Sequence, residues 1–383
     1  IAGDTCTIRS LDWDRSRFDI EFGLRNGTTY NAFLVRGERT ALIDTSHAKF
    51  RDTWIPLLQE QIDPAAIDVL IVSHTEPDHS GLIGDLIDLN PEIEIVGSKV
   101  ALQFLQDQVH RPFKSRAVKS GEELELGTNP DSGIQHRFEF LSAPNLHWPD
   151  TIFSFDHGTG ILYTCDAFGL HYCSDDIFDA DPGAIAPDFR FYYDCLMGPN
   201  ARSVLQALKR MDGLPEINTI AVGHGPLLRH HLSHWISDYR EWSGQRSKGE
   251  SYAAVCYLSQ YGFSDRISQA IAHGVGKADA QVQLVDLRAT DPQELTALIG
   301  DAKAVVVPTW PTEPDADLQT SIGTLLAALH PKQLVGVYDA FGGNDEPIDA
   351  VADQLRSQGQ KQAFAPLRIR QLPQGSDCLL YTS

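Results

Sequence analysis

The stretch Asp68–Gly81, with the sequence DVLIVSHTEPDHSG, decides the fold of this chain. It opens with an apolar run, Val69 to Val72, which predicts a strand buried on both faces. The residues that follow are polar and include Pro77 and Gly81, which argue against a continued strand or a clean helix here. The sequence therefore predicts a buried strand that ends in a polar loop.

Four side chains able to bind a metal fall within six residues of this loop: His74, Glu76, Asp78 and His79. Because alternate residues of an extended backbone point the same way, the first three are expected to converge on one side, with His79 at the turn. Four such groups left unpaired at the end of a buried strand would be costly, and a bound cation removes that cost. The alternative is a solvated polar loop with accidental histidines.

This His-x-Glu-x-Asp-His pattern resembles the metal box of the flavodiiron proteins, within the metallo-β-lactamase superfamily. Hydrolytic members of that superfamily carry His at the position of Glu76. Imidazole-rich sites suit zinc, whereas a carboxylate makes the site harder and more anionic, which favours iron. The resemblance covers nearly the whole chain and implies iron as the metal.

Three further candidate ligands, His147, Asp166 and His224, follow later in the chain, the last two directly after apolar runs. Strand ends are where α/β sheets place their ligand sites. Alone, His147 would more often be a core histidine and Asp166 a turn former, so the repetition of the pattern carries the argument. Eighteen residues separate His147 from Asp166 and 57 separate Asp166 from His224, which also resembles the family's spacing.

The resemblance implies two irons per chain, and all seven family positions are filled: His74, Glu76, Asp78, His79, His147, Asp166 and His224. It also implies that Asp166 bridges the two irons, since one carboxylate has two oxygens to offer. The sequence leaves open which histidine serves which iron.

Several neighbours of these ligands have two interpretations each. His171 lines the pocket or binds a metal, and the pocket role is favoured because iron must keep an open position for substrate. Asp150 orients a ligand histidine or forms a turn. Trp148 is expected to pack rather than to relay electrons, and His230 and His231 are expected on the surface of a polar helix.

The length of 383 residues predicts two domains, which we expect at residues 1–245 and 250–383, with a loop-like stretch at residues 243–250 between them. A net charge of −21 argues against nucleic acid or an anionic membrane as a partner. Six scattered cysteines indicate free thiols in a reducing, cytoplasmic compartment. No apolar run reaches the roughly 18 residues of a membrane span.

In the first domain, apolar runs alternate with helical spacing, which predicts an α/β layered domain and, through the resemblance, a metallo-β-lactamase-like αββα sandwich. The second domain repeats strand, turn and helix from Tyr252 onward. The resemblance implies a flavodoxin-like, doubly wound parallel sheet of five strands that holds FMN at its strand ends.

Three loops at these strand ends are the candidate FMN contacts. A strand, a hydroxyl- and glycine-bearing turn and a helix N-terminus form an anion site, although many such turns bind nothing. Trp310 is expected to stack on the flavin ring or to pack in the core. The candidates are Ser259, Gln260, Tyr261, Gly262, Phe263, Ser264, Pro308, Thr309, Trp310, Pro311, Ala340, Phe341, Gly342, Gly343 and Asn344. Phe263 and Asp265 depart from the usual flavodoxin loop.

A flavin joined to a metal pair predicts electron transfer to a small molecule. A reduced flavin and two ferrous ions together hold the four electrons that take O2 to water, whereas reduction of two NO molecules to N2O needs two. The resemblance implies an O2 or NO reductase, with oxygen favoured, acting as a head-to-tail homodimer. The alternatives are a metallo-β-lactamase-fold hydrolase, and a metal-depleted subunit that forms a hetero-oligomer with a paralogue.

The chain begins at Ile1 rather than Met and stops at Ser383, just past the flavodoxin-like region. We therefore expect that it is trimmed or part of a longer polypeptide. We also expect its electron donor to be external or a missing module: an NAD(P)H-linked reductase, a rubredoxin or a ferredoxin.

Overall fold

The computed structural model describes residues 1–18, 22–247, 251–258, 267–268, 270–272, 274–275, 280–288, 290, 292–311, 314–338 and 348–368. The chain forms two compact units, Ile1–Ser247 and Lys248–Ser383. Each unit has its own sheets and its own buried apolar clusters.

The strands of the first unit are β1 (Thr5–Asp12), β2 (Arg17–Phe18), β3 (Phe22–Gly23), β4 (Thr28–Arg36), β5 (Thr40–Ile43), β6 (Val69–Val72), β7 (Glu94–Gly97), β8 (Lys114–Ala117), β9 (Glu123–Thr128), β10 (Gln135–Ser142), β11 (Ile152–Asp156), β12 (Ile161–Cys165) and β13 (Thr219–Val222). Its α-helices are α1 (Arg51–Gln61), α2 (Pro77–Ser80), α3 (Ile83–Leu89), α4 (Lys99–Val109), α5 (Pro182–Tyr192), α6 (Ala201–Met211) and α7 (Leu232–Ser247).

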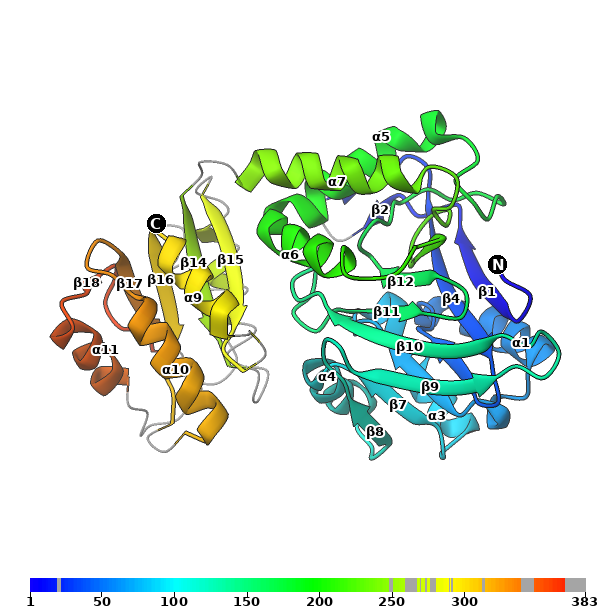
Figure 1. Cartoon of the computed structure of the whole chain (residues 1–383), viewed down its shortest axis with the longest axis horizontal. Helices are drawn as coiled ribbons and strands as arrows, with labels where there is room; N and C mark the ends of the chain where they lie inside the picture. Colours follow the sequence, from blue (N-terminus) through cyan, green and yellow to red (C-terminus); the bar gives the residue numbers. More distant parts are fainter. Residues whose placement is uncertain are drawn as a thin grey trace. The chain divides into compact units, whose positions relative to one another are not determined.

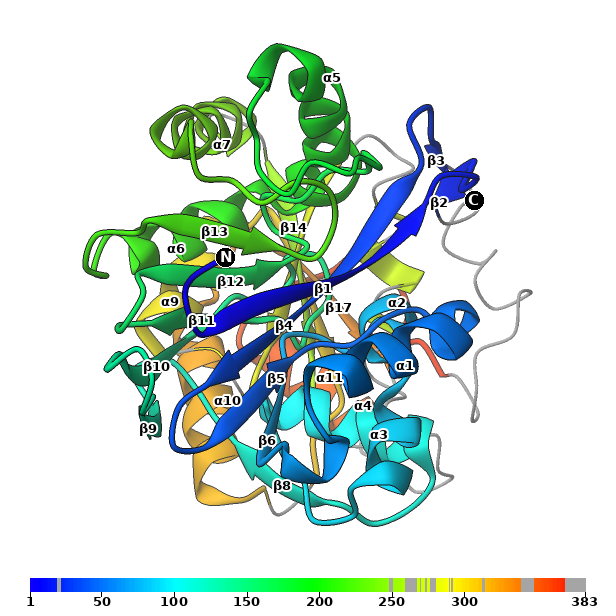
Figure 2. The ribbon, with the colours of Figure 1, turned by 90° about the vertical axis from the view of Figure 1, so that its right-hand side faces the viewer.

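The first unit is a four-layer αββα sandwich, as the sequence predicts (Figures 1 and 2). One sheet has the order β1-β4-β5-β6-β7-β8 and the other β13-β12-β11-β10-β9. An apolar core fills the space between the sheets, where Phe33 and Ile71 of the first sheet meet Phe138 and Tyr163 of the second. A second cluster joins the first sheet to α1, α3 and α4, with Trp54 buried in it. Because β6 and β12 are each covered on both faces, their apolar runs are continuous rather than alternating.

One local prediction is wrong: a short helix, α2, begins at Pro77 and ends at Ser80, just before Gly81. Proline is tolerated at the first position of a helix, where its missing N–H has no partner to lose, and Glu76 stands at the N-cap. The consequence is that Asp78 and His79 lie on a helical turn rather than in extended backbone.

Backbone hydrogen bonds tie the two sheets together at the ends of the ligand-bearing strands. The amide of Ile152 donates to the carbonyl of Ser73 at 2.8 Å, and the amide of Asn31 donates to the carbonyl of Gly223 at 2.9 Å. The Asn31 side chain donates to the carbonyls of Val222 and Gly225, both at 2.9 Å. The edge that carries the candidate ligands is therefore fixed by bonds between sheets as well as within them.

The second unit contains a parallel sheet with the order β15-β14-β16-β17-β18, which is the flavodoxin-like doubly wound order predicted from the sequence. Its strands are β14 (Tyr252–Tyr257), β15 (Gln281–Asp286), β16 (Ala304–Pro308), β17 (Leu334–Tyr338) and β18 (Lys361–Gln362), and its described helices include α9 (Pro292–Asp301), α10 (Ala316–Ala328) and α11 (Ile348–Ser357). One face of the sheet packs on these three helices. The other face packs on a smaller cluster that includes Ile267 and Ile271.

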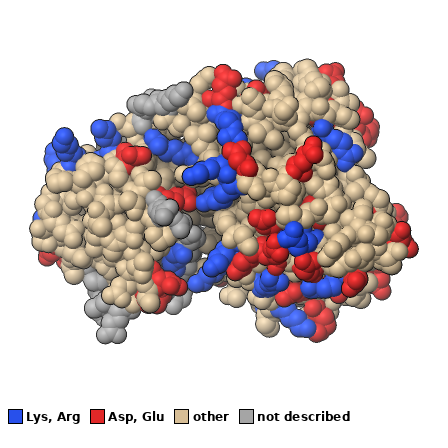
Figure 3. Space-filling view, viewed as in Figure 1, with Lys and Arg blue, Asp and Glu red and all other residues tan. Residues whose placement is uncertain are grey.

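The surface charges are mixed in sign, and the cysteines match the expectation of free thiols. On the face shown in Figure 3, Lys and Arg side chains lie among Asp and Glu side chains. Five cysteines of the described segments are free thiols, and Cys378 lies outside those segments. Among the helices that the structure describes, none is long and apolar enough to cross a membrane.

A buried ion triad in the first unit predicts a pH-dependent contribution to stability. His136 on β10 lies between Asp156, at 2.8 Å from Nδ1, and Asp4, at 3.0 Å from Nε2, and all three are buried. Burial alone would lower the pKa of His136, but the hydrogen bonds and charges of Asp156 and Asp4 outweigh it and raise that pKa. Because the pKa is higher in the folded protein, this stabilisation is fully present below about pH 6.5 and is lost as the pH rises through the folded value.

We expect His136→Asn to lower the free energy of unfolding by about 3 kcal/mol near pH 6, because two buried carboxylates lose their counter-charge. The difference from the wild type should shrink toward pH 9, as measured by thermal unfolding across that range. His157→Asn is the matched control, since His157 pairs with Glu139 at 2.9 Å in a partly exposed place and should contribute less than about 1 kcal/mol. A difference that grows with pH would contradict the assignment.

Candidate metal centre

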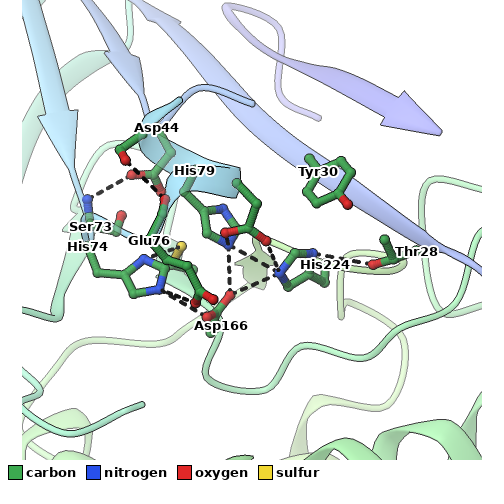
Figure 4. Close-up of polar contacts among 12 residues, drawn as sticks. Thr28, Tyr30, Asp44, Ser73, His74, Glu76, His79, Asp166 and His224 are labelled. Carbon is green, nitrogen blue, oxygen red and sulfur yellow. Dashed lines mark hydrogen bonds and ion pairs between the residues drawn. The ribbon is translucent and has the colours of Figure 1, made fainter. Parts of the chain in front are cut away.

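The candidate ligands lie at one edge of the sandwich because their strands end there (Figure 4). His74 follows β6, Asp166 follows β12 directly and His224 follows β13. His147 lies in the loop between β10 and β11, which extends over the same edge. All seven predicted ligands come together in this place, and six of them are buried, with His147 half-buried.

One group of side chains surrounds Oδ2 of Asp166. The Nε2 atoms of His74 and His147 lie 3.1 and 3.0 Å from this oxygen. Glu76 completes the group, because its Oε2 lies 3.4 Å from His74 Nε2 and 3.0 Å from His147 Nε2. His74, Glu76, His147 and Asp166 thus each aim one atom at a common point.

A second group surrounds Oδ1 of the same carboxylate. The Nε2 atoms of His79 and His224 lie 3.0 and 3.3 Å from this oxygen. Asp78 completes this group, with one oxygen 3.5 Å from His79 Nε2 and the other 3.3 Å from His224 Nε2. The geometry therefore sorts the histidines, which the sequence left open: His74 lies with His147, and His79 lies with His224.

The donor atoms of both groups fit metal ions rather than hydrogen bonds. Two ligands each about 2.1 Å from a metal are about 3.0 to 3.4 Å apart, and the distances above lie near that range. Buried donor atoms of His74, Glu76, Asp78, His147 and Asp166 have no hydrogen-bond partner among the described residues. His79 and His224 point their Nε2 atoms at each other across 3.2 Å. Such orphaned atoms are satisfied when each group holds a cation.

The electrostatics of the metal-free protein agree with this fit. Burial alone would raise the pKa of Asp166, but His79 and His74 outweigh it and hold that pKa well below its usual value. Burial alone would lower the pKa of His147, but Glu76 and Asp166 raise it to about 10. Protonated histidines thus balance the carboxylates, and metal binding would replace those protons.

Four supporting residues were not predicted from the sequence. His224 Nδ1 donates to the carbonyl of Thr29 at 2.6 Å, and Thr28 Oγ1 lies 3.4 Å from the same nitrogen. Cys165 Sγ lies 3.5 Å from His74 Nδ1, and the carboxylate of Asp44 accepts from the amide of Ser73 at 2.8 Å. Cys165 ends β12 and Asp44 follows β5 at the same edge, so their positions at the ends of apolar runs could have identified both residues from the sequence. Thr28 and Thr29 lie almost 200 residues from His224, and no local pattern points to them.

The neighbours of the ligands are placed as follows. Asp150 accepts from both the amide and the hydroxyl of Thr75, at 2.8 and 2.7 Å. These two bonds hold the loop between two ligands, His74 and Glu76, rather than a local turn. The ring of Trp148 packs edge-on against His74 with centroids 6.0 Å apart. His171 is buried next to His224, with ring centroids 4.9 Å apart, outside both ligand groups.

The prediction for His230 and His231 is partly wrong, since α7 begins only at Leu232. Both residues precede the helix, and their backbone amides donate to the carboxylate of Asp179 at 2.9 and 3.2 Å. His230 is exposed and His231 is half-buried. The segment is therefore a capped helix start rather than helix interior.

Only one of the three predicted flavin loops lies among the described residues. Pro308 ends β16, and Thr309 follows it; both residues are buried. The amide of Thr309 donates to the carbonyl of Tyr338 at 2.8 Å. Trp310 is buried in the apolar cluster and, with Pro311, lines a cavity of about 290 Å³. Outside the described residues lie Ser259, Gln260, Tyr261, Gly262, Phe263, Ser264, Ala340, Phe341, Gly342, Gly343 and Asn344.

Gly223 makes room for one ligand group. A Cβ on this residue would lie 2.6 Å from Cε1 of His79 and 3.2 Å from Cys165 Sγ. We expect Gly223→Ala to displace His79 and to lower the iron content after reconstitution by about half, since one of the two groups is disturbed. Gly97→Ala is the control, because its Cβ would meet nothing closer than 3.4 Å. Full iron content in Gly223→Ala would show that His79 is dispensable or free to move.

Comparison with known proteins adds an independent line of support. A family model described as ODP family beta lactamase matches residues 28–225. Diflavin flavoprotein A 1 from Synechocystis sp. is 54% identical over 376 residues, covering 98% of this chain and 65% of that protein. The chain thus spans slightly less than two thirds of the length of this curated relative.

Solved structures show the same architecture. A metal-soaked Flv1 flavodiiron core from Synechocystis sp. matches with a TM-score of 0.70 and 30% identity, covering 100% of this chain and 94% of that one. Rubredoxin oxygen:oxidoreductase from Desulfovibrio gigas matches with a TM-score of 0.60 and 23% identity, covering 100% and 95%. The second likeness is one of fold alone.

Proposed function

This chain belongs to the flavodiiron protein family, and from that premise we propose that it is an oxidoreductase that reduces O2 to water, NO to N2O, or both. Oxygen is the favoured substrate. The hydrolase and metal-depleted alternatives are not favoured, since the relatives are flavodiiron proteins and all seven candidate ligands converge.

The position of Asp166 carries this proposal. Its two oxygens face different sets of ligands, so that one carboxylate would bridge two irons. His74, Glu76 and His147 would hold one iron, and Asp78, His79 and His224 the other. When bound, the iron pair would supply one electron from each ion and an open position for a small substrate. The protein's own residues hold that pair rigidly, since the ligand loops are anchored by backbone bonds between the sheets.

The second unit would hold FMN at the carboxyl ends of its parallel strands. We propose residues 1–245 as the diiron domain and residues 250–383 as the FMN domain. The sheet order supports this assignment, and Trp310, which lines a cavity after β16, is a candidate to flank the flavin. A flavin and two irons together store four electrons, which matches the reduction of one O2 to two waters.

The electron donor and the assembly are part of the same proposal. The relative's name denotes two flavins, and about a third of its length lies outside the match. The donor is therefore a further flavin-bearing module or an external NAD(P)H-linked reductase, rubredoxin or ferredoxin. A homodimer would bring the flavin of one chain to the irons of another. Full activity in a strictly monomeric preparation would contradict this last point.

The first experiment is the metal and flavin content of the purified protein. We expect iron close to two per chain and a flavin absorption band. The protein would then be photoreduced without oxygen, with EDTA as the sacrificial electron donor, and mixed with O2 or NO in separate experiments, while flavin reoxidation and gas consumption are followed. NO turnover with negligible O2 turnover would reverse the substrate preference. Zinc in the site together with esterase activity would overturn the function itself.

A further inference from the structure

A cavity of about 520 Å³ lies beside the metal centre in the first unit. Its walls come from the loop after β3, from α5 and from His171. The lining residues are Gly23, Leu24, Arg25, Asn26, His171, Ala184, Pro187, Asp188, Phe191 and Tyr192. None of these is a candidate metal ligand, so the cavity is a separate feature of the fold.

Burial along the cavity changes from its mouth to its inner end. Asn26, Ala184 and Phe191 are exposed, whereas His171 and Tyr192 are 6% and 2% exposed. The inner end is next to the metal centre, because the rings of His171 and Tyr192 lie 4.9 and 6.3 Å from the ring of His224. The cavity therefore leads from the surface of the unit to two buried rings that lie next to His224 of the second ligand group.

His171 lies at the inner end of the cavity, and its Nε2 atom has no hydrogen-bond partner among the described residues. Its Nδ1 lies 2.9 Å from Thr28 Oγ1, which fixes the ring. Its Nε2 is buried and has no hydrogen-bond partner in the described part of the chain. A buried polar atom of this kind is costly unless a water or a ligand pairs with it. Phe18 packs on the ring with centroids 4.1 Å apart, which leaves the imidazole little freedom to turn away.

The mouth of the cavity is crossed by one hydrogen bond. The side-chain amide of Asn26 donates to Asp188 at 2.9 Å, and both residues line the cavity. The bond joins the loop after β3 to α5, and it lies in an exposed place. Apolar Leu24, Pro187 and Phe191 make up much of the remaining wall. Arg25 and Asp188 both line the cavity, so the mouth carries charges of both signs, and a small uncharged molecule can pass it.

We propose that this cavity is the passage by which a small uncharged diatomic molecule reaches the metal pair, and that Nε2 of His171 hydrogen-bonds that molecule at the inner end. A diatomic gas is close in size to a water, which occupies about 30 Å³, so the cavity admits it with ease. The inference rests on the proposed function, because it takes the proposed substrate as the molecule that travels. It adds the route and a residue that holds the substrate.

The passage is tested by blocking its mouth. Iron-loaded protein would be reduced without oxygen and mixed rapidly with less than one equivalent of NO, and the absorbance change on binding would be followed. Ala184→Trp places an indole in the mouth from α5, and we expect the association rate constant to fall at least tenfold with iron content unchanged. Ser233→Trp, at an exposed helical position outside the cavity lining, should stay within twofold of the wild type.

Pro187→Trp provides a second blocking variant in case Ala184→Trp does not fold. Asn26→Ala removes the bond across the mouth and should leave association as fast as the wild type or faster. Unchanged association in either folded tryptophan variant would overturn the passage while the proposed function stands. Slowed NO association in the tryptophan variants, combined with no turnover of either gas by the wild type, would instead overturn the proposed function and keep the passage.

The role of His171 has its own measurement. His171→Leu keeps an apolar side chain in place but removes Nε2, and we expect NO to dissociate at least several times faster. His171→Gln restores an N–H donor of similar reach and should recover most of the slow dissociation. If NO dissociates equally fast from both variants, or if it dissociates from both at the wild-type rate, the hydrogen bond from His171 is excluded. Melting temperature and iron content measured on the same samples separate this effect from a loss of structure.

Discussion

Replacing Asp166 with Asn is expected to remove both irons, although the side chain keeps its size. Each oxygen of Asp166 faces a different pair of histidines at 3.0 to 3.3 Å. Asn offers one weaker oxygen and an NH2 group that cannot bind a cation. Loss of an outer ligand partner already costs metal sites 10- to 100-fold in affinity, so loss of the bridge should cost at least about 100-fold. Iron content after reconstitution would fall below about a tenth of the wild-type value.

Two comparisons make this prediction specific. His147→Asn removes a residue that contacts only the group around Oδ2, and we expect it to lose one iron before the other. Asp179→Asn changes an equally buried aspartate whose hydrogen bonds are all made elsewhere, and it should keep its iron at low temperature. Iron bound normally by Asp166→Asn would refute the shared bridge and, with it, the main support for the proposed function.

Asp179→Ala is expected to lower stability strongly without touching a metal ligand. This buried carboxylate accepts from the amides of Arg229, His230 and His231, at 2.7, 2.9 and 3.2 Å, and from Trp235 Nε1 at 2.9 Å. It therefore caps α7 and anchors the chain that follows the His224 loop. Alanine leaves four donors without that acceptor, and the charged hydrogen bonds among them contribute about 1.5 to 3 kcal/mol each, partly recovered by water. We expect a net loss of about 3 kcal/mol in thermal unfolding.

Asp181→Ala is the matched control for this variant. Asp181 also caps a helix, since it accepts from the amide of Ala184 at 3.2 Å, but it is exposed. An exposed cap of this type is worth about 1 kcal/mol. Equal losses in the two variants would show that burial and the additional donors of Asp179 contribute nothing.

The sequence by itself determined the fold class and the chemical type of the centre. The apolar runs before His74, Asp166 and His224 predict strand ends, and strand ends of one sheet meet at one edge. Glu76 in place of a histidine indicates iron rather than zinc. Strands that alternate with helices also predict the parallel sheet of the second unit, whose strand order was implied by the resemblance to flavodoxin. These features depend on residues that are close together or regularly spaced in the sequence, so they can be predicted from the sequence alone.

Only the tertiary structure decided which histidines lie together around each oxygen of Asp166. His74 and His79 are five residues apart, and the sequence gives each the same chemistry. Their rings lie 4.9 Å apart, but Nε2 of His74 faces one oxygen of Asp166 and Nε2 of His79 faces the other. The helix α2 turns the chain after Pro77 and places His79 next to His224. The short helix overrode the extended backbone assumed for this loop, since proline at the first helical position costs no hydrogen bond.

The same holds for the contacts that cross the sandwich. Asp179 meets the start of α7, Thr29 meets His224, and His171 ends a cavity whose mouth is formed by the loop after β3 and by α5. Each contact joins segments tens to hundreds of residues apart. Burial makes such polar pairs obligatory, because an unpaired buried group is costly, but the sequence does not say which distant partner satisfies it. Packing of the two sheets makes that choice.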